Sequence, residues 1–112
     1  REDLQRSYLS LIDGIIGGDG TGPMTPRARC SGILIAGLNP IFADRSALAM
    51  MGCAEAKTPI LSRVAGSEGT PLAEQGRIEI RSESLRWRNL FCGAEPLKYS
   101  PPPNWEGHIE EA

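Results

Sequence analysis

The sequence predicts a small α/β fold with a mixed or mostly parallel sheet, two or three helices and an irregular C-terminal tail. Two apolar runs, Tyr8–Ile16 and Gly32–Gly37, have the length and composition of buried strands. The start and stop signals of a helix follow the second run, and prolines interrupt residues 90–112. The 112 residues suit one domain over residues 1–112 with one modest core.

Composition excludes several classes of function. The formal net charge is −2, so there is no electrostatic basis for binding nucleic acid or an acidic membrane surface. No apolar run is long enough to span a bilayer, and the charged start REDLQRS is not a signal peptide. Cys30, Cys53 and Cys92 form no CxxC pair and supply no iron–sulfur ligand set, so we expect reduced thiols and a cytoplasmic protein.

The first apolar run predicts a central strand. Side chains alternate between its two faces, and both faces are largely apolar, which suits a strand that is covered on both sides. Asp13 shares one face with Leu11 and Ile15. A loop rich in glycine and proline is expected over residues 17–31, and the alternating run Arg77–Ser82 predicts an edge strand.

The clearest helix signal lies between Asn39 and Gly52. Asn39 is a favoured N-cap residue, Pro40 fits the first helical position, and Gly52 fits the left-handed position after the last turn. A shorter helix is expected over Pro59–Ala65, where a proline again stands at the start.

Asp13 is the first candidate for chemistry. Burying a carboxylate between apolar neighbours is costly unless it is paired or hydrogen-bonded. Asp13 is therefore either a metal ligand or general base at the end of the strand, or an acceptor for backbone N–H groups that holds the following loop in shape. The residues leave both interpretations open.

The run GGDGTGP is the second candidate. A dinucleotide-binding fingerprint places a helix directly after its glycines, and here the run Pro23–Pro26 follows instead. Glycines still allow successive N–H groups to face one anion, or the main chain to approach a ligand closely; the alternative is a flexible surface loop. The ligand-loop candidates are Gly17, Gly18, Asp19, Gly20, Thr21 and Gly22.

Asn39 and Asp44 lie just after the second predicted strand. If the two strands are parallel neighbours, Asp13, the glycine loop, Asn39 and Asp44 converge on one edge of the sheet. Asp13 and Asp44 would then suit Mg²⁺ or another divalent cation that bridges a phosphate. A hairpin pairing would separate them, and the helix dipole alone accounts for an aspartate at position 44.

Three separated blocks, YLSLIDGIIGGDGTGP, GILIAGLNPIFADRSALAMMG and PPPNWEGHIE, resemble the C-terminal part of a bacterial and archaeal domain-of-unknown-function family, number three-six-two. The positions that match its pattern are Asp13, Gly14, Gly20, Gly22, Pro23, Gly37, Pro40, Asp44, Met51 and Gly52. The positions that depart from it are Asp19, Thr21, Asn39 and Arg45. Asn39 stands where the family has an aspartate, which removes one candidate cation ligand.

The resemblance implies that the chain is the C-terminal fragment of a larger, redox-associated protein, since several family members are joined to ferredoxin-type iron–sulfur modules. The implied partners are the N-terminal remainder or such a module, and the family brings no catalytic residues.

Two hypotheses about function follow. In the first, the glycine loop binds a cation or an anionic small ligand. In the second, the chain is a non-catalytic interaction module whose loop and proline-rich tail dock on the remainder of a longer protein or on a partner. His108, the only histidine, completes no catalytic triad, so the residues do not decide whether the chain is an enzyme.

Overall fold

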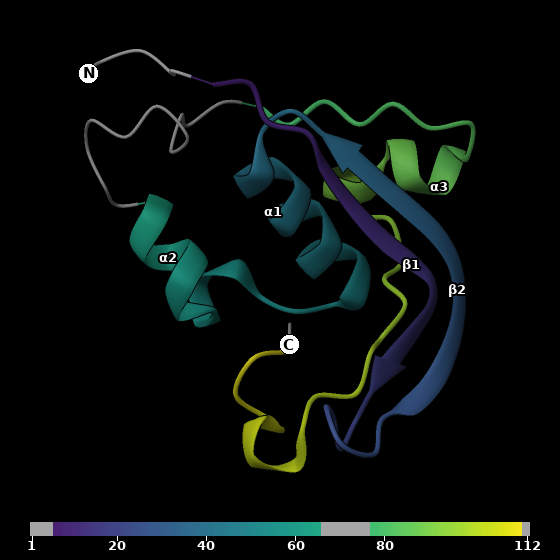
Figure 1. Ribbon diagram of the computed structural model, residues 1–112, viewed down its shortest axis with the longest axis vertical. Helices are drawn as coiled ribbons and strands as arrows, with labels where there is room; N and C mark the ends of the chain where they lie inside the picture. Colours follow the sequence, from purple (N-terminus) through teal and green to yellow (C-terminus); the bar gives the residue numbers. More distant parts are fainter. Residues whose placement is uncertain (1–5, 66–76, 111–112) are drawn as a thin grey trace.

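The computed structural model describes residues 6–65 and 77–110. Over these residues the chain forms a two-stranded sheet, three helices and short 3-10 turns, which confirms a small α/β fold (Figure 1). The strands are β1, Ser10–Asp19, and β2, Arg27–Gly37. The helices are α1, Pro40–Met51, α2, Pro59–Ala65, and α3, Leu85–Arg88.

The strand direction differs from the expected one, because β1 and β2 form an antiparallel hairpin. The pairing runs from Ser10 opposite Gly37 to Asp19 opposite Arg27, so both strands extend into residues 17–31, where a loop was predicted. Only residues 20–26 remain as the connection. A parallel crossover needs about a dozen or more residues, so this short connection permits only a hairpin.

A β-bulge interrupts the hairpin. The register passes from the Gly14–Ile33 pair directly to the Ile16–Cys30 pair, so two residues of β2 oppose Ile15. One of the two is Gly32, whose φ of 66° lies in the left-handed region that glycine adopts at little cost. The bulge increases the local twist and accounts for a glycine within this strand.

The capping signals of α1 are confirmed. The Oδ1 atom of Asn39 accepts hydrogen bonds from the N–H groups of Ile41 at 2.9 Å and Phe42 at 3.3 Å, and Pro40 occupies the first turn. Gly52 ends the helix with a φ of 83°. The start and stop of α1 are therefore fixed by local chemistry that is visible in the sequence.

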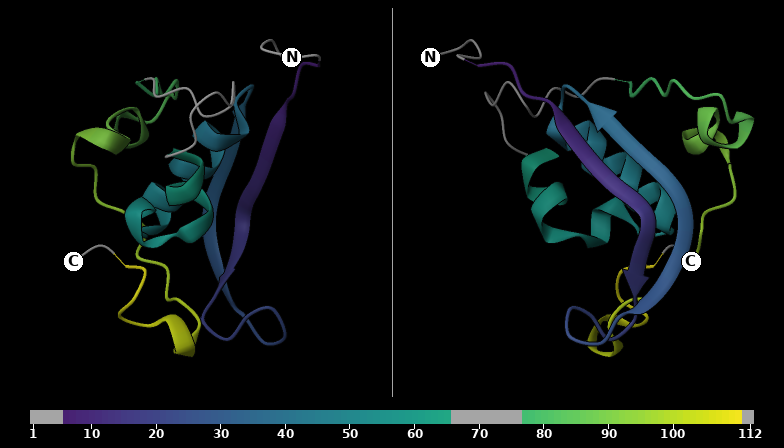
Figure 2. Two further views of the ribbon diagram at one scale, coloured as in Figure 1. Left: turned by 90° about the vertical axis from the view of Figure 1, so that its left-hand side faces the viewer. Right: turned by 45° about the vertical axis from the view of Figure 1, so that its right-hand side comes forward.

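The core is a single layer of side chains on one side of the hairpin. Helix α1 packs against this inner face, and the other face of the sheet carries no helix in the part of the chain described (Figure 2). The buried apolar residues are Ala43, Met50, Cys53, Leu61 and Leu90.

The prediction of a strand over Arg77–Ser82 is wrong. These residues are irregular, and no ladder partner is present for them among the described residues. Their alternation still has a physical basis, because Ile78 and Ile80 are half-buried while Arg77, Glu79 and Arg81 are exposed. Alternating burial needs only an extended backbone on an apolar surface, and does not require pairing.

The C-terminal tail is irregular, as expected, and it is tied to the rest of the fold by backbone hydrogen bonds. The N–H groups of Leu97 and Tyr99 donate to the carbonyl oxygens of Met50 at 2.7 Å and Met51 at 2.9 Å, at the end of α1. The N–H of Gly20 then donates to the carbonyl oxygen of Ser100 at 2.8 Å. The tail therefore links α1 to the loop end of the hairpin.

Replacing the cap of α1 gives the first testable prediction. Asn39→Ala leaves two N–H groups of the first turn without their side-chain acceptor, so we expect a loss of about 1 kcal/mol in the free energy of unfolding, measured with urea. Asn39→Asp keeps an acceptor oxygen near the positive end of the helix and should be close to neutral. Equal losses in the two variants would contradict a capping role.

Candidate functional site

The acidic edge expected from parallel strands does not form. Antiparallel pairing places the glycine loop at one end of the hairpin and Asn39, which follows β2, at the other end. Asp13 lies exposed within β1 instead of buried at its end, and Asp44 is exposed on α1. In residues 6–65 and 77–110, no group of three or more His, Cys, Asp or Glu side chains is placed to hold a metal ion.

The oxygens of Asp13 and Asn39 both serve the local backbone. The Oδ1 atom of Asp13 accepts a hydrogen bond from the N–H of Ile15 at 3.1 Å, next to the bulge, and Asn39 caps α1. Asp13 thus accepts a backbone N–H, as one interpretation held, but from its own strand and not from the glycine loop. Its role as a ligand or general base stays a prediction.

Asp19 is the buried acid of the glycine run, and its carboxylate is fully engaged. Arg27 binds it in a bidentate manner, with Nε–Oδ1 and Nη2–Oδ2 distances of 3.1 Å. Arg29 Nη1 lies 3.4 Å from Oδ2, and the N–H of Ser100 donates to Oδ2 at 3.0 Å. The Asp19 side chain is 1% exposed. Its charge is therefore neutralised within the fold, and Asp19 anchors the tail to the hairpin.

The hydrogen bond from Arg27 and that from the Ser100 N–H hold the pKa of Asp19 below its ordinary value of 3.8, against the opposing effect of desolvation. Both donors favour the ionised form. The same contact raises the pKa of Arg27. The pair is therefore charged at neutral pH, as a structural ion pair requires.

Tyr99 extends this cluster along the hairpin. The Arg29 guanidinium lies 5.1 Å from the centroid of the Tyr99 ring, and its Nη2 donates to the carbonyl oxygen of Leu97 at 2.6 Å. The hydroxyl groups of Ser31 and Tyr99 are hydrogen-bonded to each other. Sequence reasoning missed this cluster, because its members lie about seventy residues apart and their pairing depends on the strand register.

The close approach of other side chains explains the adjacent glycines at the end of β1. A Cβ atom on Gly17 would overlap the Tyr99 hydroxyl, and one on Gly18 would lie 2.9 Å from the Cβ of Pro26. Gly20 has a φ of 79° and begins the connection to β2. These glycines serve packing and turn formation.

The loop itself satisfies several of its polar groups. The Thr21 hydroxyl donates to the carbonyl oxygen of Thr25 at 2.7 Å, and the N–H of Thr25 donates back to the carbonyl oxygen of Thr21 at 3.1 Å. The N–H groups of Gly20 and Gly22 donate to backbone carbonyl oxygens. The two N–H groups therefore do not face a common anion site.

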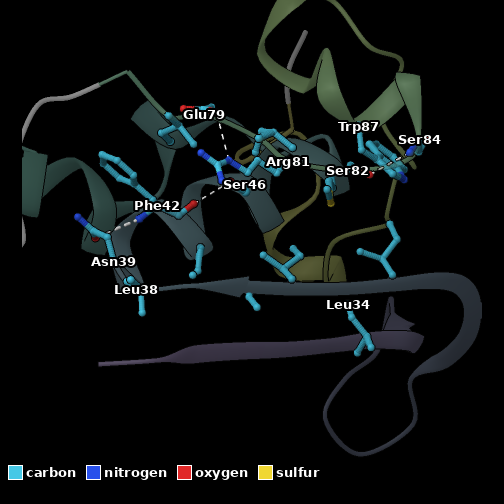
Figure 3. A pocket seen from close by; sticks show the side chains of 18 of the residues that line it. Leu34, Leu38, Asn39, Phe42, Ser46, Glu79, Arg81, Ser82, Ser84 and Trp87 are labelled. Carbon is cyan, nitrogen blue, oxygen red and sulfur yellow. Dashed lines mark hydrogen bonds and ion pairs between the residues drawn. The ribbon is translucent and has the colours of Figure 1, made fainter. Parts of the chain in front are cut away.

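An open groove of about 770 Å³ lies between β2, α1 and residues 78–84 (Figure 3). Its volume falls in the range of small-ligand sites. Its lining is mainly apolar, and includes Ile33, Ile35, Phe42, Ile80 and Trp87.

Few polar groups in this groove are available to orient a ligand. The Ser46 hydroxyl donates to the carbonyl oxygen of Phe42 at 2.8 Å, and Arg81 pairs with Glu79 at 3.3 Å. No buried side-chain nitrogen or oxygen of the described residues lacks a partner. The groove therefore offers a ligand mainly apolar contacts.

The face of the hairpin opposite α1 is apolar and exposed. We call it the outer sheet face and define it by Leu9, Leu11, Asp13, Ile15, Leu34, Ala36 and Leu38. Leu11 is 67% exposed, Leu34 60% and Leu38 77%, and Figure 3 shows Leu34 and Leu38 pointing away from Phe42 and Ser46 of α1. The expectation that β1 is covered on both faces is therefore wrong for the described residues.

Comparison with family models, with curated proteins and with solved structures gives no match. The resemblance to family three-six-two stays a prediction. None of the helices in the described ranges has the length and apolar character of a membrane-spanning segment.

The lowered pKa of Asp19 predicts a pH dependence of stability. A pKa that is lower in the folded than in the unfolded chain means that the ionised carboxylate stabilises the fold above about 3.8. This contribution disappears as the pH falls through the folded pKa. Urea unfolding from pH 7 to pH 2 should show Asp19→Asn less stable than the wild type at pH 7, with a difference that shrinks below pH 3.8.

Glu106→Gln, at an exposed position of the tail, is the matched control and should change stability little at any pH. Amide exchange of Gly20 and Ser100 should also accelerate in Asp19→Asn. A constant difference between wild type and Asp19→Asn across the whole pH range would contradict the role of the ionised carboxylate.

The contact between Gly17 and Tyr99 predicts a coupled pair of substitutions. Gly17→Ala should lower the free energy of unfolding by about 1–3 kcal/mol, because the new methyl group meets the Tyr99 hydroxyl. The same change should cost less in a Tyr99→Phe background. Gly22→Ala, where the nearest side-chain atom lies at 3.9 Å, is the control. Equal costs of Gly17→Ala in both backgrounds would show that the contact is not the cause.

Proposed function

We propose that this chain is a non-catalytic interaction module that docks on another protein surface through its outer sheet face. The observation that carries the proposal is the exposure of Leu11, Leu34 and Leu38 on one continuous face of the hairpin. Contiguous exposed apolar patches of this kind are rare on monomeric proteins and mark interaction sites. Burying one such side chain fully stabilises a complex by about 1.5–3 kcal/mol.

The surface that receives this face belongs to the remainder of a longer protein or to a separate partner. The resemblance to family three-six-two supports the first of these, since the matching segment is the C-terminal part of longer proteins in that family. In either case the outer sheet face supplies the apolar contact with that surface. The tail, whose Ser100 N–H donates to Asp19, holds the hairpin in position.

Binding of a cation or an anionic small ligand by the glycine loop has less support from the geometry. The Asp19 carboxylate is held by two arginines, and the Gly20 and Gly22 N–H groups are already bonded. Titration with Mg²⁺, Mn²⁺ or inorganic phosphate tests this alternative. Amide shifts confined to Gly17–Gly22 at millimolar concentration would favour the ligand loop over the docking face.

The docking proposal is tested by placing a photo-crosslinking amino acid at Leu34 in the protein as its own cells produce it. We expect a discrete crosslinked product that disappears when Leu11→Lys is added. The control position is Met24, which is 88% exposed in the hairpin loop and lies outside the outer sheet face. Similar products from Leu34 and Met24, or a product that is insensitive to Leu11→Lys, would contradict docking through this face.

A further inference from the structure

The outer edge of β1 is an open strand edge. The sheet of the described residues has two strands, so β2 pairs with only one edge of β1. No backbone hydrogen bond to this other edge is present in residues 6–65 and 77–110. Figure 2 shows β1 as the outermost element of the sheet, with β2 and α1 on its other side. The edge is ten residues long, Ser10–Asp19.

β1 carries few of the features that protect edge strands from pairing, and these are limited to Asp13 and the bulge at Ile15. Its sequence, SLIDGIIGGD, contains no lysine, arginine or proline, and these are the residues that usually prevent edge-to-edge association. β2 differs, because it carries Arg27 and Arg29 and faces the groove beside residues 78–84. Between the two edges, β1 is therefore the one suited to accept another strand.

Asp13 restricts what can pair with this edge. It is the one ionisable side chain of the outer sheet face, and it has no ion-pair partner among the described residues. Covering a carboxylate with apolar groups alone is costly, whereas a lysine or arginine opposite it compensates the charge.

A second copy of this chain does not meet this requirement. When β1 pairs antiparallel with β1 of another copy around a twofold axis near the middle of the strand, Asp13 lies opposite Ile16, Ile15 or another Asp13. None of these arrangements supplies a cation. The charge pattern therefore disfavours a second copy of this chain and favours a segment that carries a cation.

We propose that the open edge of β1 accepts an extended segment of a partner protein as a third strand. This segment has apolar side chains at alternating positions and a lysine or arginine opposite Asp13. The inference rests on the proposed function, because it specifies how a partner is joined to the hairpin: the added strand lies beside β1, and its apolar side chains extend the outer sheet face. Backbone hydrogen bonds along β1 bind the segment, and the cation at Asp13 sets its register.

The test selects displayed ten-residue peptides against the immobilised wild-type protein and, in parallel, against Asp13→Lys. We expect the wild type to select alternating apolar peptides with a basic residue at a common position, and Asp13→Lys to select an acidic residue there. In the synthetic peptides, exchanging the basic residue for glutamine should weaken binding by up to about fivefold. N-methylation of alternate amides on one edge of the peptide should abolish binding, and the same change on the other edge should be tolerated.

Amide exchange then locates the bound peptide. Residues of β1 should become protected, and Leu11→Lys, on the outer sheet face of β1 itself, should weaken binding, whereas Met24→Lys should not. The proposal is overturned if no peptide is selected, if Asp13→Lys selects the same peptides, or if binding survives N-methylation of both edges of the peptide. Sedimentation that shows dimers with β1 protected would overturn it in favour of a second copy.

The two proposals fail in different ways. Crosslinks from Leu34 that depend on Leu11, together with failure of the peptide selection, would leave docking through the face in place and refute only strand addition. Failure of both experiments would remove the proposed function itself.

Discussion

The arrangement of this molecule depends on the burial of one carboxylate. Asp19 lies at the end of β1, where two arginines of β2 and the N–H of Ser100 compensate its charge. These contacts join three parts of the chain that are far apart in sequence: the two strands and the tail. Because a buried carboxylate without such partners is costly, the tail and the hairpin must be placed together. The tail in turn pairs with the end of α1, which closes the fold around the core.

The features that could be predicted from the sequence are those that depend on local contacts. The limits of α1 follow from Asn39, Pro40 and Gly52, whose effects act within one helical turn, and they were predicted correctly. The strand direction follows from the short connection over residues 20–26, and it was not predicted because a loop was expected over residues 17–31. Glycines also concealed the true length of β1, since Gly17 and Gly18 resemble a loop in sequence and serve here as strand positions beneath Tyr99 and Pro26.

The candidate site was predicted in part. Asp13 was recognised as unusual for its strand, and the structure gives that aspartate an exposed position in an apolar face. Its expected meeting with Asp44 depended on parallel strands, and the hairpin removes that basis. The glycine loop was singled out for its backbone freedom, which the structure uses for the approach of Tyr99 and for the turn at Gly20. A glycine-rich run thus indicates close approach, and only tertiary contacts identify the group that approaches.

The apolar pattern of β1 and the structure lead to one conclusion about the outer sheet face. Residues on both faces of β1 are largely apolar, a pattern typical of strands that are covered on both sides. In the described residues α1 covers one face, and Leu11 and Leu34 on the other remain exposed. Leu11 and Leu34 are needed neither for the core nor for the capping of α1. In addition, an exposed apolar edge promotes unwanted association. Both facts support the proposed docking through the outer sheet face, and the exposed charge of Asp13 supports an occupant that carries a cation.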